Sequence, residues 1–190
     1  MKNTKLLLVI FLFLSVILNA QGRRVNQSSI HAQYGYVLDK DSLTGGFMAK
    51  AGYGRVMGNK GFLGKVEGFY QSYKVEYRYN QILPYKKYGI GVYGGYSYEG
   101  LAPVFFNVYG GVYGAYEMVN DGNERDPKFN ALIPAKVKGF VYGLSGSAEL
   151  EIILVRKLSL VADYTQYYDL KSEFSKSNFA LFGGLKYYIN

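Results

Sequence analysis

The chain has 190 residues, with 21 tyrosines, 12 phenylalanines and 24 glycines, only 4 prolines, and no cysteine or tryptophan. Its length predicts one domain, and the lack of cysteine excludes disulfides, thiol catalysis and cysteine-bound zinc. The formal charge of +8 comes from scattered basic residues, so it indicates a mild surface bias and not a basic nucleic-acid-binding tail.

The start of the chain has the pattern of a secretory signal peptide. Two lysines precede an uncharged apolar run over 6–18, and Ala20 is a small residue at which cleavage could occur. The run is shorter than the roughly 20 apolar residues of a membrane-spanning helix, although an uncleaved anchor remains the alternative. We predict a signal peptide over 1–20, cleavage between Ala20 and Gln21, and one domain over 21–190.

After this segment, apolar and polar residues alternate with the period of β-strands. In each alternating segment one set of side chains is apolar, and the other set includes charged residues at mid-strand. We predict eight strands, over residues 28–38, 44–56, 62–73, 86–98, 104–118, 137–153, 157–168 and 178–189.

The connections between these segments help to choose between two architectures. A soluble barrel or sandwich would turn the apolar faces inwards, whereas an outer-membrane barrel would turn them towards lipid. Connections 57–61, 99–103 and 154–157 are short, and connections 74–85, 119–136 and 169–177 are longer and polar. Short turns on one side and long loops on the other favour the membrane barrel, with a soluble all-β fold as the alternative.

We therefore predict an all-β, eight-stranded antiparallel up-and-down β-barrel in the outer membrane of a Gram-negative bacterium. Such a barrel carries aromatic girdles at both membrane interfaces. The tyrosines near segment ends that would form them are Tyr36, Tyr53, Tyr70, Tyr88, Tyr98, Tyr116, Tyr142, Tyr164 and Tyr187.

The opposite faces of the strands would fill the narrow lumen of this barrel. Eight strands leave an interior that side chains occupy, and charges buried there must be paired. We predict a polar network in the lumen, made of Lys50, Lys65, Glu67, Glu117, Glu149, Glu151, Asp163 and Lys186.

One stretch, YGIGVYGGYSY, contains Gly89, Gly91 and Gly94 in the spacing G-x-G-x-x-G that dinucleotide-binding turns use. A dinucleotide turn needs a helix after the glycines, whereas here the strand-like alternation continues. We interpret the stretch as a strand whose inward glycines leave room for Tyr93 and Tyr113, and we predict no cofactor.

Three other groups of residues could carry chemistry. Ser29 and His31 form an S-x-H pair such as some lipid-modifying barrels use, but a nucleophile also needs an orienting acid. Glu149 would lie opposite Asp163 if the sixth connection is a tight turn, as an acid/base pair or as part of the lumen network, which we favour. The basic and aromatic stretch 73–88 could stack on single-stranded nucleic acid, or form a loop and girdle. We predict no catalytic site, no metal site and no direct nucleic-acid binding.

The second half of the chain resembles the TraO family of conjugative-transposon proteins. The segments that carry the resemblance are GAYEMVN (114–120), FVYGLSGSAELEIILVRKLSLV (140–161) and NFALFGGLKYYIN (178–190). They are similar to a G-Y-E-x-V-N-like stretch, a strand with E-x-E before a short turn, and a closing glycine-containing strand of that family. The similarity covers residues 107–190 together with the signal peptide.

This resemblance implies a non-enzymatic outer-membrane component of a conjugative DNA-transfer apparatus, with a structural or accessory role in assembling the mating channel. Its partners would then be membrane lipid, other proteins of the apparatus, or further copies of the same chain. The alternative is a stand-alone small outer-membrane barrel with a binding or envelope-integrity role.

Overall fold

A computed structural model describes residues 25–38, 43–58, 61–77, 81–125, 130, 132–133, 138–172 and 176–189. The predicted signal peptide and its cleavage site between Ala20 and Gln21 lie outside these residues. Among the described residues, no helix is long and apolar enough to cross a membrane.

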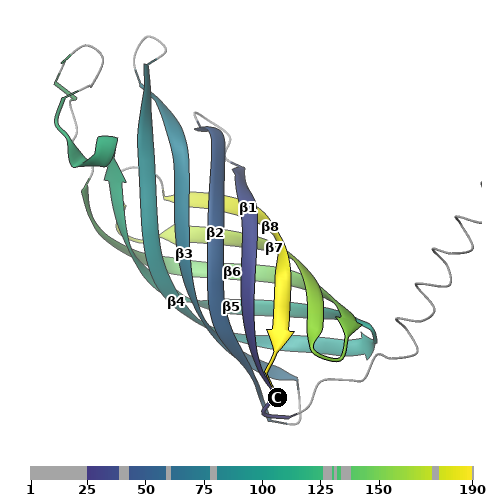
Figure 1. The fold of residues 1–190 in the computed structure, drawn as a ribbon. Helices are drawn as coiled ribbons and strands as arrows, with labels where there is room; N and C mark the ends of the chain where they lie inside the picture. The colour runs from purple at the N-terminus through teal and green to yellow at the C-terminus, as the bar shows by residue number, and fades with distance from the viewer. Residues whose placement is uncertain are drawn as a thin grey trace, which may run out of the picture.

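Eight antiparallel strands form one closed barrel, in which every strand pairs with its neighbours in sequence and β8 pairs with β1 (Figure 1). The strands are β1 (Ser28–Leu38), β2 (Leu43–Met57), β3 (Phe62–Tyr77), β4 (Gln81–Leu101), β5 (Val104–Val119), β6 (Lys138–Val155), β7 (Leu158–Asp169) and β8 (Ser177–Tyr188). The predicted fold class and the number of strands are therefore confirmed.

The strands turn their apolar side chains outwards. Along β6, Tyr142 and Leu144 are about half exposed, whereas Ser145, Glu149 and Glu151 on the alternate positions are buried. The same alternation runs around the barrel, so its exterior is apolar, and the charged side chains of the strands are buried in the interior. This is the arrangement of a membrane barrel and the reverse of a soluble one, which excludes the soluble alternative.

Aromatic side chains edge this apolar exterior. One aromatic residue from each of the strands β3 to β6 lies opposite the next in register, which makes a continuous row on the loop side. The residues of this row are Tyr70, Tyr88, Tyr116 and Phe140. Along β4 from Tyr88 to Tyr98, a rise of about 3.3 Å per residue and a tilt of about 40° give an apolar band about 25 Å tall. That height fits the hydrocarbon of an outer membrane. The other predicted girdle tyrosines on the exterior are Tyr36, Tyr53, Tyr142, Tyr164 and Tyr187.

The two ends of the barrel differ, as the connection lengths predict. Only residues 102–103 separate β4 from β5, and only residues 156–157 separate β6 from β7. These turns lie at the same end as the C-terminus, near the start of β1 (Figure 1). At the opposite end, the longer connections follow β5 and β7.

One predicted loop is wrong. Residues 74–85 belong mostly to a hairpin, because β3 continues to Tyr77 and β4 begins at Gln81. This hairpin extends beyond the ends of β1 and β2 on the loop side (Figure 1). Its inner face is held by a small apolar cluster, in which the rings of Tyr73 and Tyr85 stack with centroids 4.3 Å apart. Lysines and a proline on its outer face obscure the strand pattern in the sequence.

The segment that follows β5 is folded back by local hydrogen bonds. The 3-10 helix η1 (Asn120–Gly122) begins with two non-glycine residues at positive φ, Asn120 and Asp121. The buried side chain of Asn120 donates from Nδ2 to the carbonyl oxygens of Asn123 and Arg125, at 3.2 and 2.8 Å. These bonds stabilise an unfavourable backbone conformation at the mouth of the barrel.

Candidate functional site: the lumen and its loop-side mouth

The structure places all eight residues of the predicted lumen network inside the barrel, each no more than 6% exposed. Within the described residues, their ion pairs and hydrogen bonds fall into three groups. Lys50, Lys65, Glu67 and Asp163 meet in a central cluster, Glu149, Glu151 and Lys186 meet nearer the turns, and Glu117 lies at the loop-side mouth.

The central cluster joins strands across the lumen. Lys50 Nζ on β2 lies 3.0 Å from Asp163 Oδ1 on β7 and 3.7 Å from Glu67 Oε1 on β3. Glu67 Oε2 also accepts a hydrogen bond from Lys65 Nζ at 3.2 Å and contacts His31 Nε2 at 2.8 Å. Two lysines therefore balance two carboxylates, as the burial of these charges requires.

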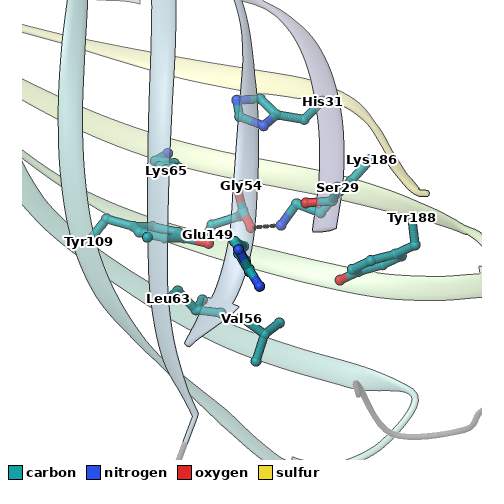
Figure 2. Close-up of a pocket in the computed structure, with 12 residues that line it drawn as sticks. Ser29, His31, Gly54, Val56, Leu63, Lys65, Tyr109, Glu149, Lys186 and Tyr188 are labelled. Atoms are coloured by element: carbon teal, nitrogen blue, oxygen red, sulfur yellow. Dashed lines mark hydrogen bonds and ion pairs between the residues drawn. The ribbon is translucent and has the colours of Figure 1, made fainter. Parts of the chain in front are cut away.

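The second cluster is built on β6 and β8. Lys186 Nζ donates to Glu149 Oε1 at 2.5 Å, which Figure 2 shows as a dashed line, and to Glu151 Oε2 at 2.7 Å. Asn107 on β5 donates to both carboxylates, at 2.8 and 3.2 Å, and Tyr188 donates to Glu151. The cavity beside this cluster has a volume of about 20 Å³, which is close to the space that one water molecule needs.

The Ser29–His31 pair does find an acid, which the sequence could not place. His31 contacts Glu67 from β3, a strand that is not adjacent to β1 in the sheet. However, Ser29 and His31 are both buried in the lumen, and no hydrogen bond joins them within the described part of the chain. The geometry therefore provides a histidine held against a carboxylate, without the hydrogen bond from Ser29 to His31 that would align a nucleophile with its base.

Glu149 and Asp163 are opposite each other in register, as predicted. Each carboxylate contacts a different lysine, Lys186 for Glu149 and Lys50 for Asp163. The pair therefore belongs to two ion-pair clusters, which supports the network interpretation over an acid/base pair.

Three aromatic rings close the lumen above the central cluster. Phe69 on β3, Tyr113 on β5 and Tyr167 on β7 meet with ring centroids 5.5 to 5.6 Å apart in all three pairs. They belong to a buried apolar layer that also includes Met48 and Phe182. Because rings from three alternate strands meet within the barrel, this layer blocks a continuous water-filled path.

Sequence reasoning missed a third charged pair on the loop side of this layer. Lys87 Nζ lies 2.6 and 2.7 Å from the two carboxylate oxygens of Asp169, and Tyr113 donates a hydrogen bond to the same group at 2.7 Å. The sequence interpretation places Asp169 in a connection. Extending the alternation of Asp163 and Thr165 by two more steps would have placed it inside.

The mouth of the barrel holds a carboxylate, Glu117, that has no cation within ion-pair distance among the described residues, while the charge of Lys87 acts on it from farther away. Glu117 is 3% exposed and accepts hydrogen bonds from Tyr85 Oη at 2.8 Å and from Ser172 Oγ at 3.1 Å. It lines a cavity of about 320 Å³ together with Lys138 and Lys171. This cavity is much larger than the one beside Glu149, and it faces the loop side.

Comparisons with known proteins bear on the fold. No protein-family model and no curated protein sequence match the chain.

Solved structures do match the chain. Neisserial surface protein A is 17% identical with a TM-score of 0.58, and the match covers 89% of this chain and 100% of that chain. A major outer membrane protein from Thermus thermophilus is 14% identical with a TM-score of 0.66, covering 87% and 100%. The outer membrane protein OprG from Pseudomonas aeruginosa is 13% identical with a TM-score of 0.54, covering 90% and 100%.

At these identities the similarity establishes the fold, which is that of small outer-membrane β-barrels. The apolar exterior of this chain and its loop-side aromatic row are the features of a barrel that is embedded in a membrane. The predicted outer-membrane location is thereby confirmed.

Proposed function

We propose that this chain is a non-enzymatic outer-membrane barrel that acts by binding at its loop-side end and contributes to the integrity of the envelope. The observation that carries the proposal is the layer formed by Phe69, Tyr113 and Tyr167, which closes the lumen. With its lumen closed, the barrel is left with its mouth and its loops as the parts that can contact other molecules outside the membrane. The β3–β4 hairpin and the folded segment around η1 extend that end.

The first test concerns the closed lumen. Full-length protein reconstituted in planar lipid bilayers should give no conductance steps above the background of the protein-free bilayer. Reproducible conductance steps from the folded protein would contradict a role that depends on binding alone.

The second test concerns the envelope. Deletion of the gene should increase uptake of a hydrophobic dye, and the wild-type chain should restore the barrier. A variant in which residues 74–84 are replaced by a two-residue turn should assemble without restoring it. As the matched control at the other end, replacement of the Arg156–Lys157 turn by Asn-Gly should restore the barrier. Full restoration by the shortened hairpin would contradict a loop-side function.

A role in conjugation is the second candidate, and the TraO-like segments support it. In the fold, 114–120 ends β5 and enters η1, 140–161 forms most of β6 and the start of β7 with their turn, and 178–190 contains most of β8. The second and third of these segments contribute Glu149, Glu151 and Lys186, which form one cluster. These two segments are therefore joined in space, as expected if one common architecture underlies the resemblance.

In this candidate the barrel would be a structural component on which other proteins of the apparatus dock, since its closed lumen has no room for a DNA strand. The test is a mating assay with the chain deleted from its element. Transfer that falls and is restored by the wild-type gene would support the conjugation role. If transfer is unchanged and dye uptake increases, the conjugation role is contradicted and the envelope role is supported.

A further inference from the structure

The barrel wall is incomplete on the loop side of β6. Pairing between β6 and β7 begins at Gly143, which lies opposite Asp169, whereas β6 starts at Lys138. Beyond the end of β7, the backbone N–H groups of Leu170 and Lys171 both donate to the carbonyl oxygen of Tyr142, at 2.9 and 3.4 Å. The first residues of β6 are therefore bordered by an irregular segment instead of a strand, and the cavity of about 320 Å³ lies between them.

The cavity lies at the height where lipid headgroups meet the barrel. Its lining includes Phe140, which belongs to the loop-side aromatic row and is 60% exposed on the exterior. Leu170 is also exposed and lines the cavity. Aromatic rows mark the boundary between hydrocarbon and headgroups, so a lipid beside β6 would bring its headgroup to this cavity.

Two cations and one carboxylate line the cavity. Lys138 and Lys171 are exposed, and neither has an ion-pair partner within the described ranges. Glu117 reaches the cavity from the inner face of β5 and is held in place by the hydroxyls of Tyr85 and Ser172. A carboxylate can accept about four hydrogen bonds, so Glu117 can accept from a further donor besides Tyr85 and Ser172.

This arrangement favours a headgroup with charges of both signs. Lysines at the membrane surface attract lipid phosphates, but a bare phosphate beside Glu117 would be repelled. A primary ammonium carries three N–H donors and can donate to a carboxylate. The opposite charges of the lining thus complement a phosphate and an ammonium on the same ligand.

We propose that this cavity binds the headgroup of a membrane lipid that carries both a phosphate and a primary amine, a phosphoethanolamine headgroup. Lys138 and Lys171 hold the phosphate, Glu117 accepts from the ammonium, and the acyl chains lie along Phe140 and Leu170. The site deepens the binding role proposed above and rests on it. Occupancy would also fill the unpaired region of the wall beside β6.

The experiment uses full-length barrel released from detergent by native mass spectrometry, with phosphatidylethanolamine, phosphatidylglycerol and phosphatidylcholine of matched chains. Phosphatidylethanolamine should be retained most. Lys138→Ala and Lys171→Ala should each lower its retention about fivefold, the effect expected for one lysine near a lipid surface. Glu117→Gln should abolish the preference for phosphatidylethanolamine over phosphatidylglycerol while retention of phosphatidylglycerol is kept or increased.

Lys157→Ala, at an exposed lysine in the turn at the opposite end, is the matched control and should change nothing. Heat-modifiable migration on gels establishes that each variant is folded, and the two exposed lysines keep the test informative if Glu117→Gln fails to fold. Equal retention of the three lipids by the wild type would overturn the proposal. So would preferential retention of phosphatidylglycerol, which would indicate anionic lipid alone. Lipid retention is measured on purified protein and dye uptake on cells. A failure of the headgroup site and a failure of the envelope role therefore give different results.

Discussion

Lys50→Met removes the cation at the centre of the lumen and tests whether the clusters hold the barrel together. The ammonium lies 3.0 Å from Asp163 and 3.7 Å from Glu67, and its side chain is 0% exposed. Methionine is similar in length and apolar, so the substitution removes the charge while keeping most of the volume.

The two carboxylates would respond differently to this loss. Glu67 keeps Lys65 and His31 as partners, whereas Asp163 keeps only the hydroxyl of Thr165 among the described contacts. The cost therefore comes mainly from Asp163, a buried charge left without a cation. Breaking a buried ion pair by removing one partner costs about 3–5 kcal/mol of folding free energy.

The assay is urea unfolding of the barrel in lipid vesicles, followed by heat-modifiable migration on gels and by the near-UV circular dichroism of its tyrosines. Asp163→Asn in the Lys50→Met background should recover more than half of the loss, because the unpaired charge is gone. Lys157→Met in the exposed turn should stay within about 0.5 kcal/mol of the wild type. A loss below about 1 kcal/mol for Lys50→Met, or additive effects in the double variant, would refute the reasoning.

Three further predictions concern packing and the mouth. Gly91→Leu places a side chain against a buried tyrosine ring and should prevent folding. Gly94→Leu should fold, because no atom lies within 4 Å of a Cβ added at Gly94, and heat-modifiable migration on gels distinguishes the two outcomes. Phe69→Ala removes one of the three rings that close the lumen and should cost about 3–5 kcal/mol in urea unfolding, and a loss under about 1 kcal/mol would contradict the packed layer. Tyr85→Phe deletes the hydroxyl that donates to Glu117 at 2.8 Å and should lower the free energy of unfolding by about 1.5–3 kcal/mol. An unchanged free energy of unfolding would contradict this prediction.

Sequence alone identified most of the candidate site because a strand has a period of two. Once residues 62–73 are read as a strand, Lys65 and Glu67 must share one face, and the charges on that face indicate which side is the lumen. The same reasoning recovered the register of Glu149 with Asp163 across a two-residue turn. It underestimated β3 and β4, whose ends continue beyond the membrane, where the outer face changes from apolar to polar. The cleavage site and the resemblance to TraO proteins stay predictions.

The sequence by itself determined the number of strands, the face that each strand turns to lipid and the end that carries the long connections, because these properties depend on local alternation and connection length. Only the tertiary structure decided which charges meet. His31 and Glu67 come from strands that do not pair, and Phe69, Tyr113 and Tyr167 come from three alternate strands. Such contacts depend on how closure and stagger bring distant strands across a narrow lumen, and no local pattern encodes that distance.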